Sequence, residues 1–425
     1  MLPSDVRRDF LLLLTSRVCT RMGDGFLRII AVLLVAAKSK DPLIAGFVLV
    51  SRYICEIIIN AISGPFVDRL RIRTSLVVSD LSRTALSVLL IAAVLLGYPY
   101  PVYLALSFLG DFVFIFFKPA VDKVVKVSFP VEEGTKVLSE VDATNHVSNI
   151  AGYTLASLAA FYLGTKTAVL FSPAFFFLSF LLVFRLQLAG EKIIDYKRVR
   201  KKSYWASQKE GLHYTWANPL LRTLLISRSV VAIGRGSFTA LSVVYLSDIT
   251  KDLSAYGYFE SAQSGGKVFA TALFIPFLFA YRSSFMLMGV SLLVIGVSFF
   301  CFNLANDVLL ACLIGALLGA GQASEAVGID ACINRYAEAH IQGRAKSTTS
   351  FGSRMAALAA IGIVYFLVKT FDFKARTLFG WLGVFPVLGA LVSFSGWMIE
   401  RSQQSFLCNP RIAGEMDRRG NPNDT

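Results

Sequence analysis

The stretch of sequence that decides the fold is Gly64-Pro-Phe-Val-Asp68-Arg69-Leu-Arg-Ile-Arg73-Thr-Ser-Leu-Val-Val-Ser-Asp80-Leu-Ser-Arg83. A short basic turn here separates two long apolar segments, and a second Asp and an Arg follow one helix deeper. Free N–H groups at the start of a neighbouring helix would favour the Asp68 carboxylate, and the arginines can pair with Asp80. The stretch predicts a charged contact that breaks and reforms as helix bundles move, although any short cytoplasmic loop also tends to be basic.

The composition places the chain in a membrane. It is 55% hydrophobic and 16% charged, whereas a soluble domain carries about 25% charged residues. The mean hydropathy is +0.62, and 425 residues leave room for about twelve spans of about 20 residues each. The net charge of +14 is typical of basic cytoplasmic loops that contact anionic lipids. No nucleic-acid-binding motif accompanies it, so no nucleic acid is expected as a partner.

Hydrophobic runs predict twelve transmembrane helices. The runs cover residues 10–37, 43–63, 74–97, 102–118, 138–163, 168–185, 221–246, 256–280, 284–304, 307–328, 348–368 and 377–399. The longest hydrophilic interruption, residues 186–220, is expected to be a basic cytoplasmic linker between an N-terminal six-helix lobe (1–185) and a C-terminal one (221–400). The polar tail 401–425 is expected to be disordered. The predicted class is an all-α membrane protein built from two six-helix bundles.

The basic residues predict the orientation of the chain. An even number of spans puts both termini on one side, and the even-numbered connections carry most of the Lys and Arg. Both termini are therefore expected to be cytoplasmic, in a multi-pass protein of the inner or plasma membrane. The six cysteines form no CxxC pair. No metal site, disulfide framework or cofactor is therefore expected.

Several motifs resemble the major facilitator superfamily, and most closely its efflux branch, which includes the macrolide and enterobactin exporters. Residues 64–83 resemble the loop between its second and third transmembrane helices. Gly23-Asp24, Phe117-Lys118-Pro119 and Gln342-Gly343-Arg344 resemble further family signatures, so the resemblance covers about residues 10–400. One departure is Gly152-Tyr153, where the efflux branch often has Gly-Pro; this weakens the inference of antiport.

The resemblance implies two pseudo-symmetric lobes that rock around a central site near the bilayer midplane. It implies secondary active efflux of a small organic molecule by alternating access, coupled to protons. Membrane lipids are expected as further partners, and the chain is expected to be a monomer. The inner gate would be held by a cluster of residues around the second and third helices. This gating cluster is Gly64, Asp68, Arg69, Arg73, Asp80 and Arg83.

Charges inside the predicted spans mark the candidate site. Arg17, Arg21, Asp24 and Arg28 lie at spacings of 4, 3 and 4 and share one helix face. An ionised side chain in hydrocarbon costs about 2.5–3.5 kcal/mol, so this stripe is expected to face water, partner charges or substrate. In the superfamily, helices one, four, seven and ten line the cavity. The resemblance then gives these candidate cavity residues: Arg17, Arg21, Asp24, Arg28, Asp111, Lys118, Arg228, Arg235 and Glu325.

An excess of cations favours an anionic or carboxylate-bearing substrate such as a siderophore, because guanidinium groups bind carboxylate and phosphate. Asp24 and Glu325 are the candidates for proton coupling. The competing interpretation is internal neutralisation, with Asp24 bridging Arg21 and Arg28. For the pairs Arg52/Glu56 and Glu260/Lys267, the bracing of helix packing is the favoured interpretation.

Three other functions stay open at this point. A macrolide or multidrug exporter and an uptake permease share the fold. A membrane-embedded enzyme or lipid-handling protein would show clustered His, Asp or Ser at one interface. The sequence instead spreads its charges over four helices and holds no recognised catalytic motif, so an enzyme is not expected.

Overall fold

The computed structural model describes residues 4–67, 72–128, 131–186, 204–250, 255–274, 283–338, 341–371 and 375–407. Within the helices, the side chains of 4–7, 60–67, 72, 117–128, 131–143, 204–207, 273–274, 375–376 and 403–407 lie outside the description. Almost every described residue is helical, which confirms the predicted all-α class.

Twelve apolar segments follow one another along the described chain. The first six are formed by α1 (Ser4–Ser39), α2 (Pro42–Val67), α3 (Ile72–Leu95), α4 (Tyr100–Ser128), α5 (Val131–Leu163) and the broken segment α6 (Thr165–Ala168), η1 (Val169–Phe171) and α7 (Ser172–Phe184). After α8 (Tyr204–Ala217), the second six are α9 (Pro219–Ile249), α10 (Ala255–Phe269) with the π turn η3 (Ala270–Phe274), α12 (Ser284–Cys301) with η4 (Phe302–Leu304), α13 (Val308–Tyr336), α14 (Gln342–Phe371), and α15 (Ala375–Leu382) with α16 (Val384–Leu407).

Its charges make α1 one of the less apolar of the described spans. Eight of the described helical segments are long and apolar enough to cross a membrane, and α1 is not among them. Its central part holds Arg17, Arg21, Asp24 and Arg28, which a lipid-facing helix would not tolerate. The helix nevertheless packs in the bundle against α5 and α7, so its polar face is covered by protein.

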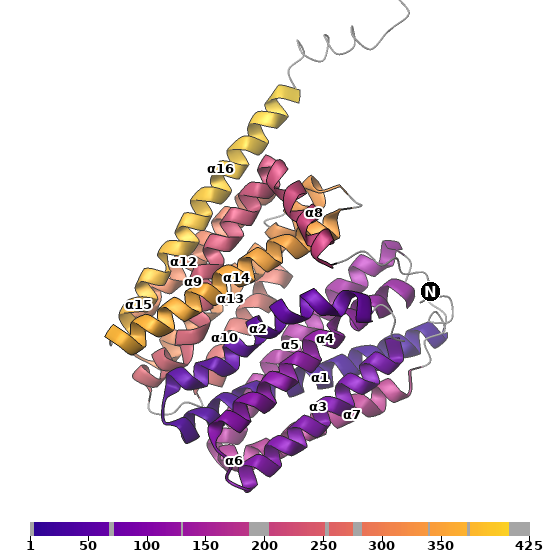
Figure 1. Ribbon diagram of the computed structural model, residues 1–425, viewed down its shortest axis with the longest axis vertical. Coiled ribbons are helices and arrows are strands. Elements are labelled where there is room, and N and C mark those ends of the chain that lie inside the picture. Colours follow the sequence, from indigo (N-terminus) through magenta and orange to yellow (C-terminus); the bar gives the residue numbers. More distant parts are fainter. Residues whose placement is uncertain are drawn as a thin grey trace, which may run out of the picture.

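Two helix groups form the molecule (Figure 1). In the first lobe, α1 packs on α5 and α7 while α3 packs on α4 and α7; in the second lobe, α9 packs on α14 and α16 while α10 and α12 pack on α13. The lobes meet through α2 with α9 and α14, and through α5 with α10. The exact boundaries expected for the linker and tail stay a prediction, since residues 187–203 and 408–425 lie outside the described part.

The lobes touch tightly at one end, where α1 ends and α2 begins; we call this the contact end, and the opposite end, beside α8, the linker end (Figure 1). A methyl group added at Gly46 of α2 would lie 2.5 Å from the Ala240 carbonyl oxygen of α9. One added at Gly257 of α10 would overlap Ser157 Oγ of α5. Glycine is required at both positions because backbone of one lobe lies against the other.

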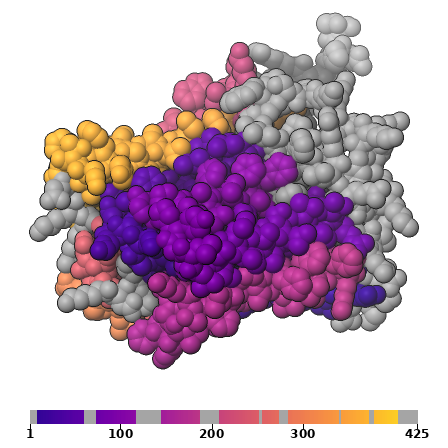
Figure 2. Space-filling view, turned by 60° about the horizontal axis from the view of Figure 1, so that its bottom comes forward, coloured from indigo at the N-terminus to yellow at the C-terminus, as the bar shows by residue number. Residues whose placement is uncertain are grey.

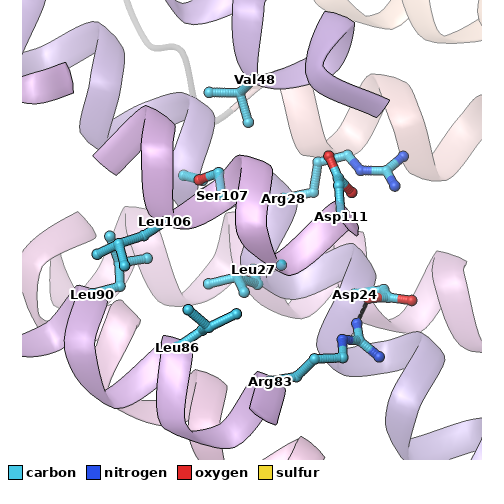
Figure 3. Close-up of a pocket in the computed structure, with 12 residues that line it drawn as sticks. Asp24, Leu27, Arg28, Val48, Arg83, Leu86, Leu90, Leu106, Ser107 and Asp111 are labelled. Carbon is cyan, nitrogen blue, oxygen red and sulfur yellow. Dashed lines mark ion pairs between the residues drawn. The ribbon is translucent and has the colours of Figure 1, made fainter. Parts of the chain in front are cut away.

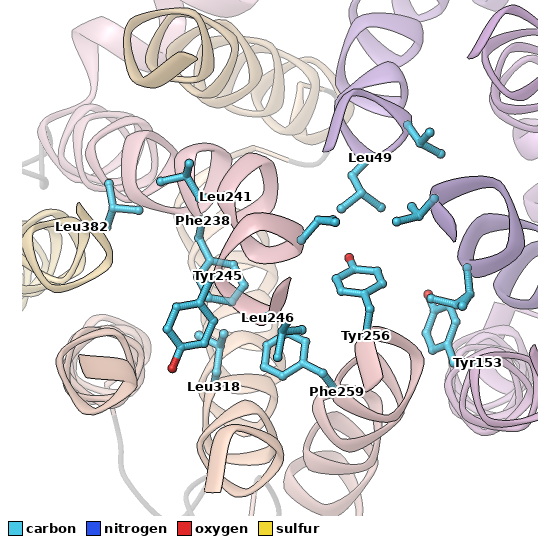
Figure 4. Packing of buried hydrophobic residues seen from close by; sticks show 14 of the residues in the cluster. Leu49, Tyr153, Phe238, Leu241, Tyr245, Leu246, Tyr256, Phe259, Leu318 and Leu382 are labelled. Carbon is cyan, nitrogen blue, oxygen red and sulfur yellow. The ribbon is translucent and has the colours of Figure 1, made fainter. Parts of the chain in front are cut away.

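An aromatic cluster fixes α9 inside the second lobe. Phe238 of α9 stacks on Phe299 at 4.9 Å between ring centroids, and Tyr245 stacks on Phe379 at 4.5 Å. The Tyr245 hydroxyl donates a hydrogen bond of 2.6 Å to the Phe302 carbonyl. Figure 4 shows Phe238 and Tyr245 on one helix, within the packed layer. This packing positions the α9 face that carries the charged residues described below.

The outer surface is apolar over wide areas. Figure 2 shows one such face, where α3 and α7 lie at the front. Large exposed side chains of these two helices include Leu89, Leu95, Phe177, Leu181 and Phe184. Soluble monomers rarely expose patches of this extent, so this surface suits the acyl chains of a bilayer.

Candidate functional site

A cavity of two chambers lies between the lobes. The first chamber, of about 270 Å³, is lined by Arg28, Leu49, Arg52, Tyr53, Glu56, Tyr153, Arg235, Phe238, Thr239, Ser242, Tyr256, Glu260, Gln263, Lys267 and Gln322. The second, of about 180 Å³, is lined by Tyr53, Glu56, Arg228, Val231, Ala232, Arg235, Glu325, Ser353, Arg354 and Ala357. Tyr53, Glu56 and Arg235 line both chambers. Together their volume falls within the range of small-ligand pockets, about 300–1,000 Å³.

The cavity lies near the middle of the helices. Arg28 comes eleven residues before the end of α1, which is about 16 Å from the contact end at 1.5 Å per residue. By the same count Arg235 of α9 and Glu325 of α13 lie about 21 Å and about 25 Å from it. A bilayer core is about 30 Å thick, so Arg28 and Arg235 lie well inside it. They depend on the cavity and on each other.

The first chamber holds three cations without a carboxylate partner. Within the described residues, Arg28, Arg52 and Lys267 form no ion pair. Of the two acids that line this chamber, Glu260 accepts a hydrogen bond of 2.7 Å from the Tyr256 hydroxyl on its own helix, and Glu56 pairs with Arg354. Tyr153 of the first lobe and Tyr256 of the second both line this chamber (Figure 4). The chamber thus offers cationic groups and phenol rings to a guest.

The second chamber is closer to neutral. Arg235 forms an ion pair with Glu325, whose side chain is only 3% exposed. Arg228 donates a hydrogen bond of 3.1 Å to the neutral Thr349 hydroxyl. The Nε atom of Arg235 is buried without a hydrogen-bond partner among the described residues. An unsatisfied buried donor is costly, so this nitrogen favours an acceptor that enters the cavity.

An ion pair joins the two lobes at the cavity wall. Arg354 of α14 donates from Nε to a Glu56 carboxylate oxygen of α2. Nearby, the Tyr53 and Thr239 hydroxyls approach to 3.4 Å across the same boundary. Phe47 and Tyr365 bring their rings edge to face at 5.3 Å. These contacts must separate if α2 moves relative to α9 and α14.

The charge balance of the cavity is positive. The described lining of the two chambers holds six cationic and three acidic side chains, an excess of three positive charges. Desolvated charges of one sign repel each other strongly at low dielectric. An anionic guest would relieve that repulsion, whereas a cation would add to it.

The helix-one stripe splits between two environments, which corrects the expectation that all of it lines the central cavity. Arg28 lines the central cavity. Arg17 is buried inside the first lobe beside Asp80. Arg21 donates from Nε to the Asn145 side chain of α5 at 3.0 Å. The stripe is covered by protein on all these sides and does not face lipid.

Asp24 pairs with Arg83 of α3 inside the first lobe, and this ion pair takes the place of the expected bridge to Arg21 and Arg28 (Figure 3). The two side chains line a small cavity of about 40 Å³ together with Arg28, Ser107 and Asp111. Asp24 Oδ2 and Arg83 Nη1 are buried without a hydrogen-bond partner among the described residues. A cavity of this size can hold water, which would supply the missing bonds.

Asp80 and Asp111 are also held inside the first lobe. Asp80 accepts hydrogen bonds from Ser179 at 2.6 Å and from Thr20 at 3.4 Å. Asp111 accepts one of 2.6 Å from Ser51. Asp80 therefore binds hydroxyl groups where the sequence predicted a pairing with the arginines of the loop. Its role in a gate stays a prediction.

Much of the predicted gating cluster lies outside the described residues. Asp68 and Arg69 are not described, and neither are the side chains around Gly64. The side chain of the cavity candidate Lys118 also lies outside the description. Arg73 is described, and it donates to the Phe184 carbonyl of α7 while its guanidinium lies 5.3 Å from that ring centroid. It thus contacts the end of the sixth span.

Comparison with known proteins places the fold. The family model described as "Major Facilitator Superfamily" matches residues 13–209, from α1 to the first turns of α8. The solved structure of "nucleoside transporter NupG (D323A mutant)" superposes with a TM-score of 0.73, at 12% identity, over 92% of this chain and 99% of that one. The chain has the major facilitator fold. Comparison with curated protein sequences finds no significant match.

The structural match confirms the predicted twelve-helix fold, and the family model agrees with the predicted resemblance over residues 13–209. The likeness to the efflux branch stays a prediction. At 12% identity the solved structure supports the fold and says nothing of the substrate.

Sequence reasoning missed several residues that line the cavity of this major facilitator fold. Arg52, Glu56, Glu260 and Lys267 were expected to brace helix packing, yet all four line the first chamber. Arg354 was not singled out. A signal was available: Arg52 and Glu56, like Glu260 and Lys267, lie within otherwise apolar runs near mid-helix. Their true partners could not be read from spacing along one helix.

Proposed function

We propose that this chain is a membrane transporter for a small organic anion, working by alternating access between its two lobes. The observation that carries the proposal is the positive cavity between the lobes, near mid-helix, with six cationic and three acidic side chains in its described lining. An ionisable residue inside a membrane protein is a sign of function because it is costly there. The major facilitator fold supports transport in place of an enzymatic reaction.

Export coupled to protons is the finer part of the proposal. It rests on the resemblance to the efflux branch and on the position of Glu325, which is almost fully buried and paired with Arg235 in the cavity. A substrate acid that binds Arg235 competes with Glu325. In this proposal the release of Glu325 from Arg235 is the step at which the coupled proton is taken up. Asp24 is the second coupling candidate, acting through Arg83 in the first lobe.

The orientation follows from the basic connections and is part of the same proposal. With both termini cytoplasmic in an inner or plasma membrane, the contact end would face outward and the linker end inward. The closed contacts at Gly46 and Gly257 would then seal the outer side. Each chain carries a complete cavity between its own lobes, so a monomer is sufficient for transport.

Transport in proteoliposomes tests the proposal. The purified chain would be assayed with radiolabelled citrate, a catecholate siderophore, erythromycin and uridine, in both directions and with an imposed pH gradient. Movement of citrate or the siderophore, well above that of erythromycin and uridine, supports an anion transporter. Movement of erythromycin alone would instead favour the macrolide alternative and overturn the anion preference.

A matched pair of variants tests the coupling step. Glu325→Gln is expected to abolish transport driven by a pH gradient while leaving substrate exchange measurable, because exchange needs no net proton movement. Glu400→Gln, whose carboxylate is buried at the other end of the second lobe near Arg335, serves as the control. Gradient-driven transport that survives in Glu325→Gln would contradict the assignment, and the same test with Asp24→Asn decides the second candidate.

A further inference from the structure

The cavity has cationic groups at two separate levels. Arg28 and Arg52 line only the first chamber, and Arg228 lines only the second. Arg52 lies ten residues from the start of α2 and Arg228 twenty-one residues from the end of α9, which corresponds to about 15 Å and about 31 Å from the contact end. The two levels are therefore about 16 Å apart along the helices, and long side chains shorten the span between their charged groups.

The cations of the first level are drawn from both lobes. Arg28 of α1 and Arg52 of α2 belong to the first lobe, and Lys267 of α10 to the second. None of them has an ion-pair partner among the described residues. The two acids that line this chamber already have partners, Glu260 in the Tyr256 hydroxyl and Glu56 in Arg354. The chamber lining holds four cations, Arg235 included, and two carboxylates that already have partners, which leaves a site for an acid group. A guest acid here would touch both lobes.

The second level also has cationic groups that can bind an acid, but here the neighbouring carboxylates already form ion pairs. Its carboxylates are already taken, Glu325 by Arg235 and Glu56 by Arg354. Arg228 is left with a neutral hydroxyl, and Arg235 Nε has no acceptor within the described residues. This end can therefore accept one more anionic group. Tyr53 lines both chambers and offers a ring to the body of the guest.

We propose that the substrate is an organic dianion whose two acid groups sit at opposite ends of its body, one held by Arg28, Arg52 and Lys267 and the other by Arg228 with Arg235. This rests on the proposed anion transport and narrows its substrate class. A carboxylate, or an acid of similar shape such as a phosphate, fits either end because a guanidinium binds both with two parallel hydrogen bonds. Two charges neutralise most of the cavity's excess of three.

The test compares diacids with their own monomethyl esters. The ligands are alkanedioic acids from butanedioic to dodecanedioic acid and the monomethyl ester of each. They would be titrated by calorimetry into the purified full-length chain, held in detergent-free nanodiscs of zwitterionic lipid. Each pair shares its length and apolar body and differs by one charge. We expect the diacid of best-fitting length to bind about 10- to 100-fold more tightly than its ester, since a hydrogen bond to a charged group is worth about 1.5–3 kcal/mol.

Variants then assign the two ends. In Arg228→Gln, and separately in Arg52→Gln, the ratio of diacid to ester affinity is expected to fall close to one. Arg401→Gln changes an exposed arginine that lies over Trp397 at 5.8 Å, and should keep the ratio of the unaltered chain. The measurement on the unaltered chain alone is decisive, so a variant that fails to fold does not remove the test.

The outcomes distinguish failure of the dianion inference from failure of the proposed anion transport. A ratio near one at every length, with citrate still transported, overturns the dianion inference and leaves anion transport standing. Binding of erythromycin with no binding of any acid overturns both. A large ratio that persists in Arg228→Gln also overturns the inference, because the second acid would then be held elsewhere.

Discussion

Replacing Glu56 by Gln should shift the balance between the two states of the lobes. Glu56 of α2 and Arg354 of α14 form the described ion pair that crosses the lobe boundary at the cavity. The pair exists in the state described here, in which the contact end is closed. Any state that opens the contact end moves α2 away from its partners in the second lobe. Loss of the pair therefore favours opening.

The size of the effect follows from the exposure of the pair. Glu56 is 21% and Arg354 22% exposed, so the pair is neither a surface bridge, worth about 0.2–1 kcal/mol, nor fully buried, where removing one partner costs about 3–5 kcal/mol. Solvent in the cavity screens it, and an intermediate value of about 1–2 kcal/mol is expected. That corresponds to about a 5- to 30-fold change in the ratio of the two states.

Accessibility of a cysteine in the cavity measures this ratio. Gln322 of α13 lines the first chamber, and Gln322→Cys can be labelled with a membrane-impermeant maleimide added to each side of proteoliposomes in turn. The same chain without this substitution gives the background from native cysteines. Labelling from the contact-end side should become about 5- to 30-fold faster in Glu56→Gln.

A double-mutant cycle separates the ion pair from other effects. Glu56→Gln, Arg354→Gln and the double variant should show a coupling of the size given above. Glu260→Gln is the matched control, because it removes a cavity carboxylate that is bonded within its own helix. If the Glu56 and Arg354 effects simply add, or if Glu260→Gln has the same effect, the assignment of this pair as an interlobe contact that resists opening is refuted.

Three further predictions concern packing. Gly257→Ala should disturb the α5 contact and lower the thermal unfolding midpoint, whereas Gly265→Ala on the same helix, with open space around it, should leave the midpoint within error. Phe238→Ala removes the centre of the aromatic cluster and should cost about 3–5 kcal/mol of unfolding free energy, measured by denaturant titration. Arg83→Gln leaves the buried Asp24 carboxylate unpaired and should cost about 3–5 kcal/mol; adding Asp24→Asn should recover part of that loss, and no recovery would contradict the pairing.

The spans could be predicted from sequence because the bilayer imposes a local rule. About twenty apolar residues are needed to cross it, so each span can be recognised from its own sequence alone. The predicted runs at 43–63 and 284–304 match α2 and α12 to within a few residues at most ends. The charged face of α1 was recognisable for the same reason, since 3.6 residues per turn align its four charges.

The partners of the charges could not be predicted, because they come from different helices. Spacing along α1 suggested that Asp24 would bridge Arg21 and Arg28, but Arg83 of α3 takes that position. Spacing along α2 likewise suggested a pair of Arg52 with Glu56. In the structure, Glu56 instead pairs with Arg354 of α14. An i,i+4 pair is worth only about 0.2–0.5 kcal/mol. An ion pair between helices stabilises a buried charge by more than this. The packing of the helices therefore decides which residue pairs with each charge.

The lobe boundary gives the charged residues of this fold two different tasks. Asp24 with Arg83 and Asp80 with Ser179 lie within one lobe, so they can persist while the lobes rotate as rigid units. Glu56 with Arg354 crosses the boundary, so this pair has to break if the lobes separate as proposed. Arg52 connects the two groups, because it lines the cavity while its guanidinium lies 4.6 Å from the ring of Phe114, which Arg83 also approaches at 5.3 Å. In the proposed function, an acid that binds Arg52 would therefore contact a cation that also packs against the Phe114 ring inside the first lobe.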